Sequence, residues 1–256
     1  MTLADYVKKI SFWLVQPREP VSDIHKLSRW VKVLKTSDEF AGWFDEFYTH
    51  FDLLNTRLPK DQLEMFTRMK DLCRIPRLST FAVGAIINEV VSRLGKDCSY
   101  VNVGVWHGFS FLSGMKGNED KTCIGIDNFS EFHAPRRQFM KRFRRHRSAQ
   151  HHFHYMDYRD YFSGKHEGRI GFYFYDGEHS YHNQLEGLQI AEPFFSRNCV
   201  VMVDDTNWAA PRKATMDFIR KSEYAYEILL DRKTAFNFHP TFWNGIMLLR
   251  KKGKKR

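Results

Sequence analysis

A chain of 256 residues can bury a substantial core in one large domain, or in one domain plus a smaller appendage, without disulfides. A hydrophobic fraction of 43%, with 23 Phe and 11 Tyr, argues against a disordered chain, and no apolar run approaches the ~20 residues of a membrane-spanning helix. The four cysteines form no C-x-x-C pair and the N-terminus lacks a signal-peptide pattern, so we expect reduced thiols, no membrane span and a cytoplasmic protein.

The formal net charge of +10 comes from two basic segments, 136–147 and the C-terminal tail. Together their thirteen cations exceed the whole net charge: Arg136, Arg137, Lys141, Arg142, Arg144, Arg145, Arg147, Arg250, Lys251, Lys252, Lys254, Lys255 and Arg256. One interpretation is that they bind nucleic acid, an anionic membrane surface or a phosphorylated substrate. The other is that they are a solvated helix face and a frayed tail.

Residues 1–80 show helical periodicity without strand alternation. Apolar residues between 24 and 34 recur at i, i+3, i+4 spacing, and a cap-like sequence at 37–39 predicts a second helix that runs to Phe51. We expect three or four helices that form an N-terminal helical cap over 1–80, followed by the main domain over 81–256.

From residue 81 onward, short apolar strands alternate with helices. We expect helices at 81–94, 134–146, 183–195 and 211–222, and strands at 100–103, 123–126, near 154, 171–175 and 199–203. The last two strands, 226–230 and 245–249, have no crossover helix between them. The pattern predicts an α/β fold, Rossmann-like and doubly wound: a mostly parallel seven-stranded sheet with an antiparallel terminal hairpin, plus the N-terminal helical extension.

The residues that follow each strand are the candidates for binding, because parallel strands end together at one crevice. Gly104 and Gly108 follow the first strand and precede a helix, where glycine lets the backbone approach a ligand. A plain tight turn is the alternative. Asp127 ends the second strand and can accept both hydroxyls of a ribose, or it can be a helix N-cap.

Near the third strand, Met156 and Asp157 are placed to contact an adenine, with Met156 on the ring and Asp157 near the exocyclic amine. A histidine-rich stretch precedes them, made of His146, His151, His152 and His154. Because these histidines show no helical pairing with acidic residues, we interpret the stretch as a polar loop rather than a metal site.

The fourth and fifth strands end in aspartates. Asp176 follows the fourth strand and Asp204 and Asp205 follow the fifth, so the three carboxylates should face one another across the crevice. A divalent cation would offset their repulsion, and all-oxygen ligands suit Mg²⁺, with Mn²⁺ or Ca²⁺ as alternatives. The structural alternative is that these aspartates are N-caps of the helices that follow.

Four strand-end runs, VNVGVWHGFS, IGIDNF, YDGEHSY and VVMVDD, carry a family resemblance. Over residues 80–252 the chain resembles the class I S-adenosylmethionine (SAM)-dependent methyltransferases. Within them it is similar to a metal-dependent O-methyltransferase group that includes the macrolide sugar O-methyltransferases and cephalosporin-pathway proteins.

The resemblance implies which residues bind SAM and a metal. It implies that Gly104, Gly108, Ser110 and Asp127 help to bind SAM and that Asp176, Asp204 and Asp205 ligate a metal. The full predicted cofactor-binding set adds Asn102, Met156, Asp157 and Asp176. Asn102 stands where the family has an acidic residue; its amide still accepts a hydrogen bond but lacks the charge that attracts the cationic half of SAM.

Methyl transfer requires alignment of the acceptor oxygen with the methyl group and removal of the acceptor proton. Glu178 and His179 are the candidates for the general base, and bracing of the loop is the structural alternative for His179. The aromatic loop at 236–243 either walls an acceptor pocket or packs beneath the terminal hairpin.

We expect metal-assisted O-methylation of a sugar, a polyketide or another polyhydroxylated small molecule. The alternatives are an RNA methyltransferase that uses the basic helix at 136–147 and a non-catalytic scaffold that retains the fold. The N-terminal extension is of the kind that shapes an acceptor pocket or a homo-oligomer interface.

Overall fold

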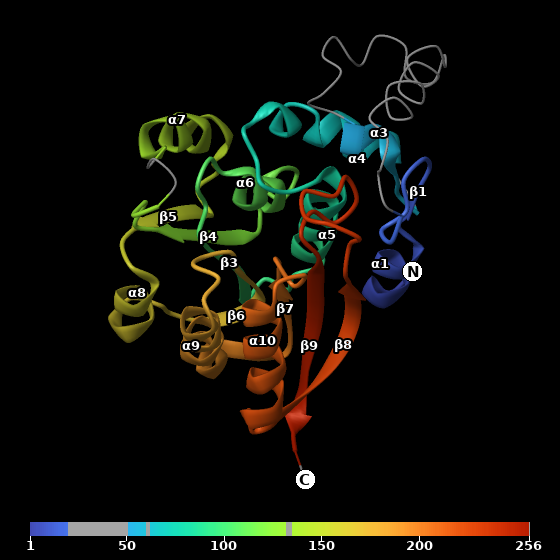
Figure 1. Cartoon of the computed structure of the whole chain (residues 1–256). Coiled ribbons are helices and arrows are strands. Elements are labelled where there is room, and N and C mark those ends of the chain that lie inside the picture. Colours follow the sequence, from blue (N-terminus) through green and yellow to red (C-terminus); the bar gives the residue numbers. More distant parts are fainter. Residues whose placement is uncertain (20–50, 60–61, 132–134, 256) are drawn as a thin grey trace.

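The computed structural model describes residues 1–19, 51–59, 62–131 and 135–255 (Figure 1). The helices expected between residues 24 and 51 therefore lie outside the described residues, apart from their last residue. Within the described part of the N-terminal segment, a strand pair joins the helices, which the periodicity did not predict. The elements are α1 (Leu3–Lys9), β1 (Ser11–Phe12), α3 (Phe51–Asn55), β2 (Thr56–Arg57), α4 (Gln62–Met69) and the 3₁₀ turn η1 (Leu72–Arg74).

The centre of the molecule is a seven-stranded sheet with the order β5-β4-β3-β6-β7-β9-β8. The first five strands in this order are parallel, and β9 runs antiparallel to both β7 and β8. This confirms the predicted doubly wound sheet with an antiparallel terminal hairpin. The strands are β3 (Cys98–Val103), β4 (Thr122–Asp127), β5 (His151–Tyr155), β6 (Arg169–Tyr175), β7 (Phe195–Val203), β8 (Tyr224–Arg232) and β9 (Ile246–Lys254).

Helices cover both faces of the sheet (Figure 1). Alternate strand residues divide between two cores: Phe172 and Met202 pack in the core that contains α5, α6 and α7, and Tyr173 and Val201 pack in the core that contains α8, α9 and α10. The described N-terminal elements belong to the first core. The helices are α5 (Phe81–Ser92), α6 (Phe109–Met115), α7 (Arg136–His146), α8 (Tyr158–Gly164), α9 (Tyr181–Ala191), the 3₁₀ turn η2 (Glu192–Phe194) and α10 (Ala209–Lys221).

Two segments differ from the prediction. The histidine-rich stretch is not a polar loop: His146 ends α7, and the other three histidines lie on the edge strand β5. This strand pairs with β4 from Cys123↔His151 to Asp127↔Tyr155, and His151 is buried against Asn118. The basic tail does not fray at residue 250, because β9 continues to Lys254, which pairs with Tyr224 of β8. The interpretation as a frayed tail is therefore wrong for the described residues.

The strand register brings the candidate residues to one edge of the sheet. Val103 pairs with Ile126 and with Tyr175, and Tyr175 pairs with Val203. The residues that follow these strands are therefore neighbours in space, although about 100 positions separate the first from the last. Among the described helices, none combines the length and the apolar character that crossing a bilayer requires.

Candidate functional site

A cavity of about 600 Å³ lies at the carboxyl ends of the parallel strands. Its lining includes residues from the loops after β3, β4, β5, β6 and β7, and from the loop between β8 and β9. Of the residues predicted from the sequence, ten line it: Gly104, Ser110, Asp127, Met156, Asp157, Asp176, Glu178, His179, Asp204 and Asp205. The four loops that carry Gly104, Asp127, Asp176 and Asp204 thus share one cavity.

Gly104 begins the loop after β3 and allows two strand ends to approach closely. Its φ is +79°, and a Cβ atom there would lie 2.0 Å from the backbone oxygen of Asp176. Only glycine fits this position, on both conformational and steric grounds. The position therefore holds the turn after β3 against the acidic loop after β6.

Asp127 organises the same turn from the neighbouring strand. Its Oδ2 accepts hydrogen bonds from the backbone N–H groups of Val105 (2.8 Å) and Trp106 (2.9 Å), and its Oδ1 accepts one from Phe129 (2.6 Å). Asp127 is not the N-cap of a described helix, which was the structural alternative from the sequence. A carboxylate has about four acceptor positions, so one remains for a ligand hydroxyl.

Backbone strain is concentrated around the cavity. The non-glycine residues with positive φ in the described chain are Trp106, Phe129, Asp205, Phe238 and Trp243, and every one of them lines the cavity. Residues in this conformation typically cluster at functional sites, because the surrounding structure must hold them there.

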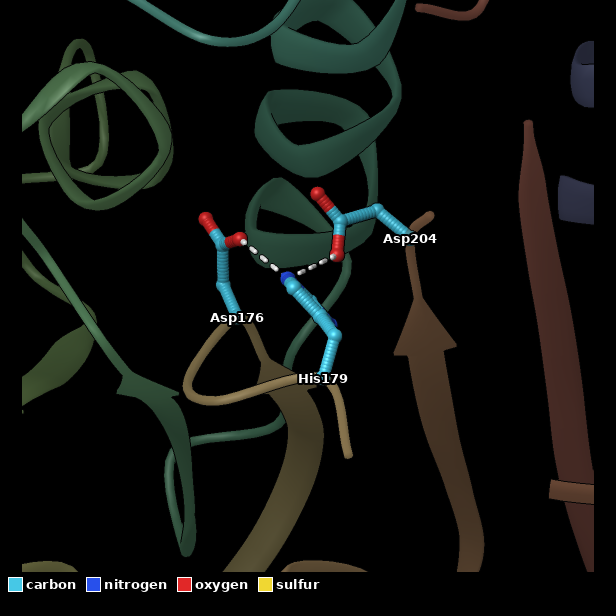
Figure 2. Close-up of side chains that lie close together, drawn as sticks. All are labelled: Asp176, His179 and Asp204. Atoms are coloured by element: carbon cyan, nitrogen blue, oxygen red, sulfur yellow. Dashed lines mark ion pairs between the residues drawn. The ribbon is translucent and has the colours of Figure 1, made fainter. Parts of the chain in front are cut away.

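Asp176, His179 and Asp204 come together in the cavity (Figure 2). The Nε2 atom of His179 points between the carboxylates, 4.0 Å from Asp176 Oδ1 and 3.8 Å from Asp204 Oδ1, and it lies 3.4 Å from Asp205 Oδ2. Asp176, His179 and Asp204 each offer one possible metal-ligand atom, and these three atoms all lie within 4.8 Å of one another. The histidine, which the sequence assigned to proton transfer, therefore lies inside the acidic cluster.

Burial and mutual repulsion perturb the carboxylates. Burial first, and then the negative charges of Asp204 and Asp205, raise the pKa of Asp176 well above its ordinary value. Burial and the charge of Asp205 raise the pKa of Asp204 to about 7, although His179 opposes this rise. Burial also raises the pKa of Asp205. Oδ1 of Asp204 is buried and has no hydrogen-bond partner among the described residues.

Glu178 and His179 are placed differently. Glu178 is exposed, and its carboxylate accepts a hydrogen bond from the side chain of Asn183 on α9. His179 is largely covered and contacts the Trp208 ring edge-on at 5.9 Å between centroids. Of the two candidates for a general base, only His179 therefore adjoins the acidic cluster.

Two residues of the predicted cofactor set do not line the cavity. Asn102 is fully buried on β3, where its amide donates to the backbone oxygens of Val103 (3.2 Å) and Gly104 (3.1 Å). Gly108 is the N-cap of α6 with a φ of +102°, and a Cβ atom there would lie 2.9 Å from the Phe139 ring. In this placement Asn102 supports the turn after β3, and Gly108 allows α6 to pack on α7.

Met156 and Asp157 lie at the β4–β5 side of the cavity. Asp157 is also the N-cap of α8, where its Oδ1 accepts from the backbone N–H of Arg159 at 2.8 Å. Met156 packs in part against the core that contains α8, α9 and α10. The rest of its side chain lines the cavity. Helix α8 was not predicted, because its apolar residues follow the cap within one short turn.

The sequence analysis missed several residues of the cavity wall. Arg77 lines the cavity and forms an ion pair of 2.6 Å with Asp52. The other carboxylate oxygen of Asp52 accepts a hydrogen bond from the backbone N–H of Phe81 at the start of α5. Of the aromatic loop at 236–243, the exposed Phe238 lines the cavity, whereas Phe242 is buried against Phe12. The loop therefore both lines the cavity and contributes to the core. Asn244 was not predicted as a site residue, because a single asparagine in a loop is not distinctive in sequence.

The family model described as a methyltransferase domain matches residues 101–206. Comparison with the curated proteins gave no match. Among solved structures, the chain is similar to an O-methyltransferase from Bacillus cereus in complex with S-adenosylhomocysteine (SAH), with 14% identity and a TM-score of 0.52 over 76% of this chain and 92% of that one.

Two further solved structures are comparable. The O-methyltransferase TomG from Streptomyces achromogenes, involved in tomaymycin synthesis and in complex with SAM, is 13% identical, with a TM-score of 0.51 over 75% of this chain and 89% of that one. An SAH-bound methyltransferase from Podospora anserina is 13% identical, with a TM-score of 0.53 over 76% of this chain and 89% of that one.

At these identities the solved structures show the fold alone, whereas the family match covers the segment from β3 to the loop after β7. That segment contains Gly104, Asp127, Asp176 and Asp204, the residues around which the cavity is built. Residues 101–206 thus match a methyltransferase domain, and they form the parallel part of a Rossmann-like sheet.

Proposed function

We propose that this chain transfers the methyl group of SAM to a hydroxyl of a polyhydroxylated small molecule, such as a sugar or a polyketide, with the help of a divalent cation. The observation that carries the proposal is the sharing of one cavity by Asp127 and by the Asp176–Asp204 pair. A volume of about 600 Å³ is in the range of small-molecule sites.

The SAM half of the cavity is assigned to the loops after β3, β4 and β5. Asp127 keeps an acceptor position for the ribose hydroxyls, and the half-buried Met156 offers an apolar surface to the adenine beside Asp157. Ser110 Oγ, 3.5 Å from Asp176 Oδ2, lies between this half and the acidic cluster. The SAH- and SAM-bound relatives have the same fold, which supports this half of the assignment.

The acidic cluster fits a divalent cation. Asp176 and Asp204 are the proposed ligands, with Asp205 beside them. The buried Oδ1 of Asp204, which has no hydrogen-bond partner among the described residues, is the kind of atom that a cation satisfies. Oxygen ligands favour Mg²⁺, and the adjoining imidazole makes Mn²⁺ suitable as well. A bound cation would lower the pKa of the acceptor hydroxyl and fix its orientation.

The acceptor half has aromatic walls and a base. Trp208, Phe238 and Trp243 line it, and aromatic rings of this kind pack against the apolar faces of sugars and polyketides. His179 adjoins the acidic cluster and contacts Trp208, which places its imidazole where the acceptor hydroxyl would lose its proton. Glu178 is exposed and engaged by Asn183, so we assign it no part in the chemistry.

Calorimetric titration with SAH tests the cofactor half, using the wild type, Asp127→Asn and the exposed control Asp120→Asn. We expect Asp127→Asn to weaken binding by about 10-fold or more, because a charged hydrogen bond contributes about 1.5–3 kcal/mol. The control should match the wild type. A folded wild-type protein that binds no SAH would overturn the transferase assignment for this site.

Release of SAH from SAM, measured with a panel of glycosides, catechols and hydroxylated polyketides, tests the acceptor half. We expect turnover with Mg²⁺ or Mn²⁺ and its loss with EDTA. SAH binding together with turnover that EDTA leaves unchanged would refute the metal while it preserves the transferase. Turnover with none of these hydroxylated acceptors would count against the proposed acceptor class.

A further inference from the structure

The two basic segments differ in how their charges are satisfied. On β9, Lys252 pairs with Glu227 (2.7 Å) and Lys254 pairs with Glu223 (3.2 Å), both on β8, and Lys251 is buried. Arg250 also lies 3.8 Å from Glu227. The cations of the C-terminal strand are therefore largely neutralised within the terminal hairpin.

Among the described residues, no carboxylate pairs with the exposed cations of helix α7. Arg137, Lys141, Arg144 and Arg145 are exposed, and no carboxylate of the described residues lies within ion-pair distance of them. We call these four residues the α7 basic face. The next cation, Arg142, contacts the Nδ1 atom of His107 at 3.1 Å and is partly covered, so it is not counted with the face. Four exposed charges without counter-charges form a local positive field on one element.

The α7 basic face is a continuous stripe. At 3.6 residues per turn the four cations fall within about 100° of arc, opposite Phe139 and Phe143, which are 0% and 3% exposed. The stripe spans about 12 Å along the helix, from Arg137 to Arg145. Its apolar side is already used in the core.

The composition of the face favours nucleic acid over a membrane. Three of the four residues are arginines, whose planar guanidinium groups bind phosphate in a bidentate manner. Helices that bind membrane surfaces insert an apolar face, and here the phenylalanines are buried in the protein.

An aromatic platform lies at the start of the helix. The Tyr155 side chain is 54% exposed, and the Arg136 guanidinium stacks over its ring at 3.8 Å. Unpaired bases stack on tyrosine rings and on guanidinium planes. Tyr155 directly precedes Met156 and Asp157, so the platform leads from α7 to the rim of the cavity.

We propose that the α7 basic face, with Tyr155 and Arg136 at its end, binds the phosphodiester backbone of single-stranded RNA. This inference does not depend on the proposed methyl transfer, because it concerns a surface outside the cavity and is tested without SAM. Whether the RNA is an acceptor is a separate question that the same variants answer when SAM is added.

Fluorescence anisotropy with a labelled, mixed-sequence, single-stranded RNA of about 20 nucleotides tests the proposal. One variant combines Arg137→Gln, Lys141→Gln, Arg144→Gln and Arg145→Gln. The matched control combines Arg250→Gln, Lys252→Gln, Lys254→Gln and Lys255→Gln, which removes the same net charge from the hairpin. Circular dichroism checks that both remain folded, and the exposed positions on α7 make this the expected result.

We expect the wild-type affinity to fall with salt with a logarithmic slope of about 3, as four released counterions predict for a single strand. The α7 variant should bind about 10-fold or more weakly with a flatter slope, and the hairpin variant should stay within about threefold of the wild type. Equal binding of single-stranded DNA would assign the affinity to the shared phosphodiester backbone and would support the proposal.

Three results would overturn the inference. Equal loss in both variants would mean that only net charge matters. If the wild type bound no RNA at about 50 mM salt, the α7 basic face would not be an RNA-binding surface. Binding of phosphatidylserine vesicles through the α7 residues, without binding of RNA, would assign the face to membranes instead.

Discussion

The side chain of Asn244 donates a hydrogen bond of 2.8 Å to Oδ1 of Asp205, across 39 positions of sequence. Its own Oδ1 accepts from the backbone N–H of Phe238 at 2.8 Å, and the residue is 3% exposed. One amide therefore connects the acidic loop after β7 to the aromatic loop that walls the proposed acceptor half of the cavity. Asp205 and Phe238 are both held at positive φ, which makes this connection a means of fixing two strained segments together.

Asn244→Ala is expected to loosen the aromatic loop. The change leaves Asp205 Oδ1 and the N–H of Phe238 without partners, so the free energy of unfolding should fall by about 1–3 kcal/mol. The affinity for SAH should change by less than about threefold, because the loop lies on the proposed acceptor side. Urea unfolding and calorimetry measure the two quantities. Asn237→Ala, at an exposed position, is the control, and an equal loss of stability in both variants would contradict the prediction.

Asp204→Asn is expected to alter the pH dependence of stability. Because the pKa of Asp204 is raised from 3.8 to about 7 in the folded protein, the folded state keeps a proton that the unfolded state releases. The unfolding free energy of the metal-free protein should therefore fall as pH rises from about 4 to 7, by at most about 1.4 kcal/mol per pH unit from this group. The variant cannot ionise and should lose this contribution.

Melting curves in EDTA check this expectation against the exposed control Asp97→Asn. At about pH 8 the Asp204→Asn variant should melt higher than the wild type, by about 2–4 °C for each kcal/mol of relieved repulsion. Added Mn²⁺ should raise the melting temperature of the wild type and of the control but not of Asp204→Asn. Superimposable profiles of melting temperature against pH for all three proteins would show that the cluster is not strained by charge.

The central part of the fold was predictable from sequence for a physical reason. Strands buried on both faces consist of nearly continuous apolar residues. β4 ends at an aspartate, and a glycine or an aspartate directly follows β3, β6 and β7. The edge strand β5 has only one neighbour in the sheet, so its exposed positions stay polar. His152 is exposed while His151 is buried, and this alternation was hidden by the identity of the two residues.

The candidate site was predictable at the level of loops and not of side-chain directions. A residue that ends a strand is placed at the crevice, but the pleat decides which face it points to, and Asn102 points into the core beside Tyr100. His179 was assigned to proton transfer, yet its place among three carboxylates depends on how the loop after β6 folds back. The role of Asn244 could not be predicted, because its partner Asp205 is distant in sequence.

Gly104→Ala is expected to destabilise the fold strongly. The methyl group would overlap the backbone oxygen of Asp176, and alanine would have to adopt a φ of +79°. We expect a loss of about 3 kcal/mol or more in unfolding free energy, measured in urea, together with loss of SAH binding. Gly95→Ala is the matched control, because a Cβ atom there meets nothing within 4 Å. A Gly104→Ala protein as stable as the control would show that the strand ends are not so close.

His179→Gln separates the two roles that its position allows. As the base, the imidazole removes the acceptor proton, so kcat should fall by about 10²–10⁴-fold while the affinities for SAH and Mn²⁺ stay within about threefold. Mn²⁺ binding is followed by electron paramagnetic resonance, which needs no acceptor, and kcat is measured with an acceptor found in the panel. Glu178→Gln, one position away and exposed, should keep its kcat. If His179→Gln instead lost Mn²⁺ affinity in proportion to kcat, the histidine would be a metal ligand, and the proton would have to leave by another group.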